Sequence, residues 1–181
     1  DGVGQFAQAP DSPSLRPTGG VTLEGWVNVA ALGGSRVIVA KAAGSGTSNS
    51  YALWMNGGNL YGAVGTVTGI PTTVGYAWNP TPNAWRHVAF TFDEATKVQS
   101  LYVDGALVAR NSTTASLAAS NAYDAHPVVI GADFESGKFA GFFNGKLDEV
   151  RVWGLARSPI DLQRDAARGL TGSETGLAGY W

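Results

Sequence analysis

The sequence predicts an all-β protein, a sandwich of two antiparallel sheets, and three observations lead to that fold class. Apolar and polar residues alternate with period two in several short segments, most regularly over 21–29. Turn dipeptides separate these segments, with Asn-Gly at 56–57 and 144–145 and Asp-Gly at 104–105. The composition, with 25 glycines, six tryptophans and 14% charged residues, also suits short strands joined by tight turns. Strands do not alternate with helices as an α/β fold would require.

The first half of the chain predicts five strands, at 3–9, 21–29, 36–41, 51–55 and 60–64. Pro10 ends the first, because proline cannot donate to a ladder. The last two flank Asn-Gly-Gly-Asn and predict a hairpin. In the second strand Glu24 and Trp26 share one face. Glu24 then needs either a basic partner or solvent, since a lone buried carboxylate is costly.

The second half continues the pattern and adds one short helix. Further strands are expected at 72–78, 85–92, 98–103, 106–110 and 127–131. The helix follows Ser158, an N-cap residue before Pro159, and ends before Gly169. A closing strand over 177–181 is expected beside the first strand, since sequentially distant ends commonly meet in two-sheet jellyrolls.

The stretch 144–153 combines a turn with a core strand. Its Asn-Gly pair suits a tight turn, because both residues tolerate positive φ. Val150 and Val152 then share one face, while Glu149, Arg151 and Trp153 share the other. Leu147 has the wrong parity to join the two valines. This predicts a bulge near Asp148 that would redirect its carboxylate.

Length and composition exclude several classes of protein. The chain of 181 residues, 44% hydrophobic, fits one domain over 1–181 with a sizeable core. It has no cysteine, so a disulfide framework or a thiolate metal site is impossible. A net charge of −2 gives no footprint for nucleic acid. No apolar run approaches the roughly 20 residues that cross a bilayer, so no membrane insertion is expected. Both ends look cut from a larger multidomain protein.

Four segments in sequence order resemble the LamG-like jellyroll domains of the concanavalin A-like lectin/glucanase superfamily. The stretch 144–153 is similar to the family's late signature, in which a glycine and an aliphatic residue precede Asp-Glu-Val-Arg and an aromatic strand end. The other matches are the segments 1–3, 23–27 and 85–105. Together the matches span nearly the whole chain. The resemblance implies a concanavalin A-like jellyroll with one short C-terminal helix.

The resemblance also implies a structural calcium ion where the first strand meets the late signature strand, held by Asp1 and Asp148. Ca²⁺ takes several oxygens from carboxylates and backbone carbonyls, which loops rich in Asp, Asn and Gly supply. The alternative is that Asp148 only caps the turn through the backbone.

The candidate ligand-binding residues are aromatic, because a sugar presents an apolar C–H face that stacks on an aromatic ring beside polar side chains. They are Trp54, Tyr61, Tyr76, Trp78 and Asn79. The segment 133–135 is expected as a loop that could line the same rim. The alternative for the two tryptophans is packing against a neighbouring loop. The other tryptophans of the matched motifs are expected as core or sheet-covering residues; they are Trp26, Trp85 and Trp153.

No enzyme is expected. The superfamily's glucanases place acids at alternate positions of one strand, whereas Asp148 and Glu149 are adjacent and would point to opposite faces. The leading hypothesis is therefore a non-catalytic module that binds a carbohydrate within a larger extracellular protein. A protein-binding adhesion module or a structural spacer is the first alternative. A glycoside hydrolase or lyase is the second, and two carboxylates within about 5.5 Å in an open groove would favour it.

Overall fold

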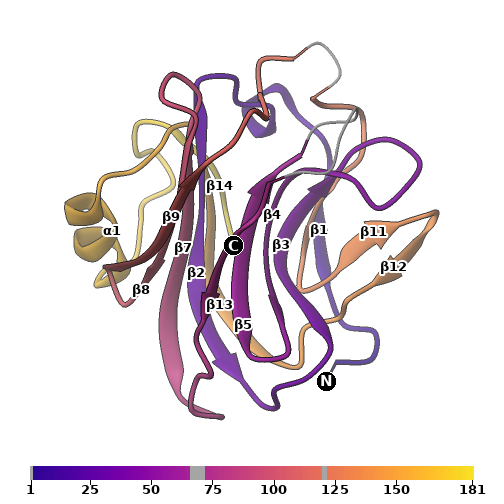
Figure 1. Ribbon diagram of the computed structural model, residues 1–181, viewed down its shortest axis with the longest axis vertical. Coiled ribbons are helices and arrows are strands. Elements are labelled where there is room, and N and C mark those ends of the chain that lie inside the picture. The colour runs from indigo at the N-terminus through magenta and orange to yellow at the C-terminus, as the bar shows by residue number, and fades with distance from the viewer. Residues whose placement is uncertain (1, 66–71, 120–121) are drawn as a thin grey trace.

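The computed structural model describes residues 2–65, 72–119 and 122–181, which form a sandwich of two six-stranded antiparallel sheets (Figure 1). The first, called the β4 sheet, has the order β1 (Ala7–Ala9), β10 (Val128–Ile130), β3 (Ser35–Ala42), β4 (Asn49–Asn56), β5 (Asn59–Val64), β6 (Val74–Ala77). The second, called the β2 sheet, has the order β14 (Leu177–Tyr180), β13 (Gly145–Trp153), β2 (Gly20–Val29), β7 (Trp85–Asp93), β8 (Val98–Val103), β9 (Ala106–Ser112). The expected jellyroll sandwich is confirmed.

Three smaller elements complete the described chain. A hairpin of β11 (Asp133–Glu135) and β12 (Lys138–Ala140) projects beside the β4 sheet (Figure 1). A 3₁₀ turn, η1 (Pro13–Leu15), follows β1, and the helix α1 (Pro159–Ala166) lies on the outer side of the β2 sheet (Figure 1). Among the described residues no helix is long and apolar enough to cross a bilayer.

The core fills the space between the two sheets. Alternation in β2 sends Leu23 and Val27 inward, where they join Leu53, Leu60 and Phe90, all of which are fully buried. Burying each such side chain contributes about 1.5–3 kcal/mol before the entropy of ordering it is deducted. The period-two pattern of the sequence thus produces the sandwich, because each strand has one apolar face to hide.

The outer face of the β2 sheet carries a buried polar layer beneath α1. Glu24 has no exposed surface; its Oε1 accepts a hydrogen bond from Trp153 Nε1 at 2.8 Å and lies 3.5 Å from Arg151 Nη1. Arg151 also donates to the Asp165 carbonyl oxygen of α1 at 2.8 Å, and Leu162 of the helix is fully buried. The basic partner that Glu24 was expected to need is therefore present.

The expected bulge lies in β13. Asp148 pairs with Trp26, and the register then shifts before Arg151 pairs with Glu24. Glu149 occupies the extra position with φ of 53°. The additional residue lets Leu147 and Val150 both face the core, which explains the parity conflict in the sequence.

Two sequence-based expectations are wrong in detail. The closing strand β14 pairs with β13 and not with β1, because the Gly154 amide bonds to the Gly176 carbonyl oxygen at 2.8 Å and returns the chain along the strand that it has just left. Residues 133–135 are a strand of a hairpin and not a loop. Trp85, expected as a core or sheet-covering residue, is not in the core; it stands at the first position of β7 with an exposed fraction of 42% and lines a hollow with Trp26.

Candidate functional site

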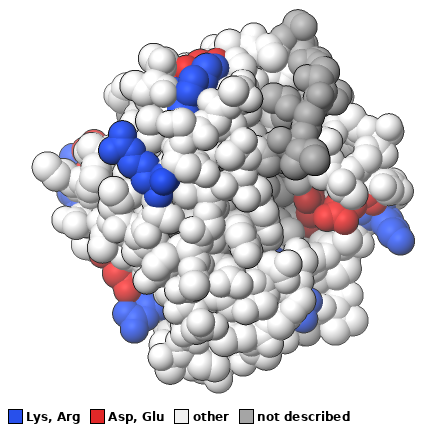
Figure 2. Space-filling model, viewed as in Figure 1, with Lys and Arg blue, Asp and Glu red and all other residues white. Residues whose placement is uncertain are grey.

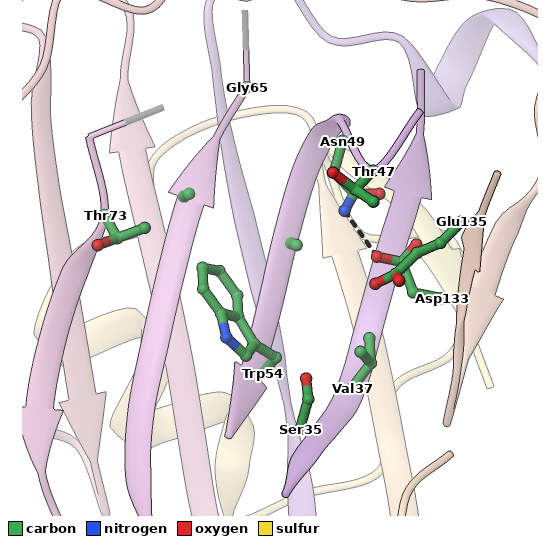
Figure 3. A pocket seen from close by; sticks show the side chains of 11 residues that line it. Ser35, Val37, Thr47, Asn49, Trp54, Gly65, Thr73, Asp133 and Glu135 are labelled. Carbon is green, nitrogen blue, oxygen red and sulfur yellow. Dashed lines mark hydrogen bonds between the residues drawn. The ribbon is translucent and has the colours of Figure 1, made fainter. Parts of the chain in front are cut away.

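A pocket of about 220 Å³ opens on the outer face of the β4 sheet, between β3, β4 and β5 on one side and the β11–β12 hairpin on the other. Figure 3 shows its side chains, and Figure 2 shows acidic atoms lying in the hollow between the sheet and the hairpin. This face is opposite the core, and α1 lies on the other side of the molecule (Figure 1). The β4 sheet thus has an open outer face at this pocket.

Trp54 and Tyr61 form an aromatic pair on this outer face. They are register partners in β4 and β5, and their ring centroids are 5.5 Å apart with the planes inclined by 20°. Both are half-buried, because their strand neighbours Leu53 and Leu60 take the core face. Gly75 on β6 makes room for the Tyr61 ring, since a Cβ there would come within 2.8 Å of it. The pair offers flat apolar surface of the kind that binds a sugar face.

Small residues give the pocket its depth. Ala52 and Ala63 lie beneath the opening, next to Val37 and the Trp54 indole. At Gly65 a Cβ would meet the Asn49 carbonyl oxygen at 1.6 Å, so the chain can pass there only as glycine. A larger side chain at any of these positions would fill the hollow.

Two carboxylates form the hairpin wall of the pocket. Asp133 and Glu135 are alternate residues of β11 and both line the cavity (Figure 3). Asp133, with 4% of its surface exposed, accepts hydrogen bonds from Asn49 Nδ2 and from the Phe134 amide, each at 2.7 Å. Burial raises the pKa of Asp133 above its ordinary value despite these bonds. Burial, together with the nearby charge of Asp133, also raises the pKa of Glu135.

The segment 133–135 was expected at the rim of the ligand site, but as a loop; the hairpin was missed, although a signal for it was present. Asp133-Phe134-Glu135 is followed by Ser136-Gly137, a pair that suits positive φ, and by Lys138-Phe139-Ala140. Alternation on both sides of such a turn predicts a hairpin. Because β11 and β12 have only three residues each, the pattern is too short to separate from a loop.

The structure divides the five expected ligand-binding residues between two faces. Trp54 and Tyr61 lie together on the outer face, beside the pocket. Tyr76 pairs with the buried Leu60, and both Tyr76 and Trp78 pack against the core from the other face. Asn79 is exposed, with φ of 46°, and its amide donates to the Gly58 carbonyl oxygen at 2.8 Å. Asn79 therefore shapes a loop at the β4–β5 hairpin and does not line the pocket.

Asp148 lies on the outer face of the β2 sheet, away from this pocket. Its side chain is exposed, and Oδ1 accepts a hydrogen bond from the Glu149 amide at 2.9 Å. Glu149 is itself bound by Arg151 and by the Tyr180 hydroxyl group. Asp1 lies outside the described residues. Within residues 2–65, 72–119 and 122–181, no three His, Asp or Glu side chains gather as metal ligands. A calcium ion there would need backbone carbonyl oxygens or water in addition to the two expected carboxylates.

Several solved structures share this fold, and some of them are described as carbohydrate-binding. A candidate carbohydrate-binding protein from Bacteroides ovatus superposes with a TM-score of 0.74 at 22% identity, over 98% of this chain and 49% of that protein. The CBM40 domain of the Ruminococcus gnavus IT-sialidase, bound to α2,3 sialyllactose, gives a TM-score of 0.70 at 14% identity, over 92% of this chain and 97% of the domain.

Enzyme-linked structures share the fold as well. The leech intramolecular trans-sialidase gives a TM-score of 0.69 at 15% identity, and the match covers 94% of this chain but 28% of that protein. No curated protein matches the sequence. At these identities the likeness shows the fold alone.

The family of the chain follows from its sequence, by a match to a family model. Residues 1–163 match Laminin_G_3, the family described as the concanavalin A-like lectin/glucanases superfamily. This match covers the four segments on which the resemblance was based, together with all the strands of the sandwich except β14. The chain belongs to the concanavalin A-like lectin/glucanases superfamily.

Proposed function

We propose that the chain is a non-catalytic module that binds a carbohydrate on the outer face of the β4 sheet, as part of a larger extracellular protein. The observation that carries this proposal is the pair of Trp54 and Tyr61, half-buried and stacked beside a pocket. Sugar rings stack on such surfaces, and Asn49, Thr47 and the two acids supply hydrogen-bonding groups around the rim. The sialyllactose-bound CBM40 domain shares the fold and supports the class of ligand.

A glycan array tests the proposal. We expect the wild-type chain to bind one class of glycan, and Trp54→Ala to lower that binding at least about tenfold, as the loss of a buried aromatic contact does. Trp85→Ala is the matched control, because it removes an exposed tryptophan from the other sheet. If the wild-type chain bound no glycan on the array, the proposal would be refuted. A protein-binding adhesion module or a structural spacer would then be favoured.

A glycoside hydrolase is the second candidate, and one observation favours it. Asp133 and Glu135 occupy alternate positions of one strand and both line the pocket, and glycosidases use such a pair of carboxyl groups as an acid and a second carboxylate. The raised pKa of each suits a general acid. Release of reducing sugar from a bound glycan, abolished in Glu135→Gln, would establish hydrolysis. Binding without release supports the non-catalytic module.

The calcium ion stays a prediction that rests on Asp1 and Asp148. Its test is the melting temperature of the chain with calcium and with a chelator, because an ion that binds only the folded state stabilises it. We expect calcium to raise the melting temperature of the wild type and to leave the melting temperature of Asp148→Asn unchanged. Equal melting temperatures in both buffers would dismiss the ion.

A further inference from the structure

The wall of the pocket carries negative charge with no matching positive charge. Asp133 and Glu135 line the cavity, and no lysine or arginine is among its lining residues. Among the described side chains neither carboxylate takes part in an ion pair, whereas Asp11, Asp104 and Asp165 each do. Figure 2 shows the acidic atoms inside the hollow, surrounded on the sheet side by uncharged surface.

The groups that face the two acids do not neutralise them. Asn49 and the Phe134 amide give Asp133 neutral hydrogen bonds. Lys138 is the register partner of Glu135 on β12, and its charge lowers the pKa of Glu135, but burial and the charge of Asp133 outweigh that effect. The Lys138 side chain is exposed and forms no ion pair with Glu135. Buried carboxylates are normally paired with a cation or protonated. Burial raises the pKa of Asp133, and its two neutral hydrogen bonds offset that effect only in part.

We propose that the sugar bound beside Trp54 carries a protonated amine, as an unacetylated glucosamine unit does, and that Asp133 and Glu135 bind its ammonium group. This inference rests on the proposed function and names the ligand class for the same pocket. An ammonium donates hydrogen bonds to acceptors only, and the pocket offers the two carboxylates and Asn49 Oδ1, which is buried without a hydrogen-bonding partner. The sugar ring would lie against the Trp54 indole.

The same charges disfavour an acidic sugar. The carboxylate of a sialic acid in this pocket would face two like charges, which disfavours its binding. The sialyllactose bound by the CBM40 domain is such a ligand. Although that domain shares the fold, this chain is expected to select the opposite charge, because fold does not determine which groups line a pocket.

Isothermal titration calorimetry of the wild-type chain, at about pH 6, where ordinary carboxyl groups are ionised, tests the proposal. The ligands are a short glucosamine oligomer, the N-acetylglucosamine oligomer of the same length, and sialyllactose. We expect the glucosamine oligomer to bind at least about tenfold more tightly than the acetylated one, since a charged hydrogen bond contributes about 1.5–3 kcal/mol. Sialyllactose should bind more weakly than both.

Matched variants identify the source of the preference. Glu135→Gln should reduce affinity for the amine to that for the acetylated oligomer, while Glu174→Gln, which removes the same charge outside the pocket, should leave the ratio unchanged. Trp54→Ala should weaken the binding of both oligomers. If the wild type bound the amine and the acetylated oligomer with equal affinity, and Trp54→Ala weakened the binding of both, the ammonium assignment would be overturned. The proposed carbohydrate-binding function would stand.

Two other results would point elsewhere. If calcium alone bound the wild type but not Glu135→Gln, the acids would hold a metal ion and the ammonium assignment would fail. If no oligomer bound, and the chain bound no glycan on the array, the proposed function itself would fail.

Discussion

Glu24 shows what a single buried charge requires of its neighbours. Its carboxylate is enclosed between the β2 sheet and α1 and is held by Trp153 and Arg151. His87 Nε2 lies 3.3 Å from Oε2 but forms no hydrogen bond with it. The alternation of β2 predicted a basic partner or solvent for this residue. It could not identify Arg151, because the two residues are 127 positions apart and only the sheet brings them together.

Removing Arg151 should therefore be costly. Arg151→Met leaves Glu24 buried without its cation, and we expect the free energy of unfolding to fall by about 3–5 kcal/mol. Denaturation in urea measures the change. Arg86→Met is the control, since that side chain and its partner Asp104 are both exposed and their ion pair should contribute less than about 1 kcal/mol. A loss at Arg151 no larger than at Arg86 would contradict the role of the buried charge.

Asp133→Asn, unlike Arg151→Met, should stabilise the protein at neutral pH. The pKa of Asp133 is raised in the folded state, so the contribution of this residue to stability is largest below the ordinary pKa of 3.8 and is lost as the pH rises through the folded-state pKa. The asparagine cannot ionise, and its side chain can still accept from the Phe134 amide. We expect the variant to melt above the wild type at neutral pH and the difference to disappear in acid. A lower melting temperature at neutral pH would refute this.

The β11–β12 hairpin is the element that positions both acids, and it is also the element that sequence analysis missed. Its turn places Ser136 at φ of 49° and Gly137 at 83°, and the Ser136 amide donates to the Gly46 carbonyl oxygen at 2.9 Å. By contrast, the bulge in β13 was predictable, because Leu147 and Val150 cannot both face the core without an extra residue. A parity conflict inside a long strand carries more information than three residues of alternation.

The turn can be tested directly. Ser136→Asn should stabilise the hairpin, because asparagine tolerates positive φ, whereas Ser136→Val should cost about 1–2 kcal/mol in the same conformation. Thermal melting measures stability, and glycan titration measures binding. We expect Ser136→Val to weaken sugar binding as well, since it disturbs the wall that holds Asp133 and Glu135. Unchanged binding in a destabilised variant would show that the wall does not contact the ligand.

For the whole molecule, the sequence predicted the two-sheet sandwich and the family. It did not predict which aromatic residues share a surface. Trp54 and Tyr61 face outward while Tyr76 and Trp78 pack on the core side, and that division follows from strand register. Turn dipeptides indicate where strands pair, but the face that a short strand such as β6 buries depends on its neighbour. The acidic pocket forms where the β11–β12 hairpin lies against strands that are distant in sequence, and no local sequence pattern predicts such a long-range contact.

One core shared by both sheets should unfold as one unit. Leu53→Ala, deep between the sheets, should lower the free energy of unfolding by about 2–5 kcal/mol and leave a single transition by circular dichroism and by tryptophan fluorescence. Leu107→Ala is the control, because that side chain is 52% exposed on β9. Two separate transitions in the wild type would show that the sheets are not one cooperative unit.

The placement of α1 has a practical consequence. Ile160 on this helix is 76% exposed, and the helix covers the side of the sandwich opposite the pocket (Figure 1). Because the chain contains no cysteine, Ile160→Cys would create a unique thiol for chemical coupling. A chain attached to a sensor chip or a bead through that thiol would direct its pocket toward the solution, with every molecule in the same orientation.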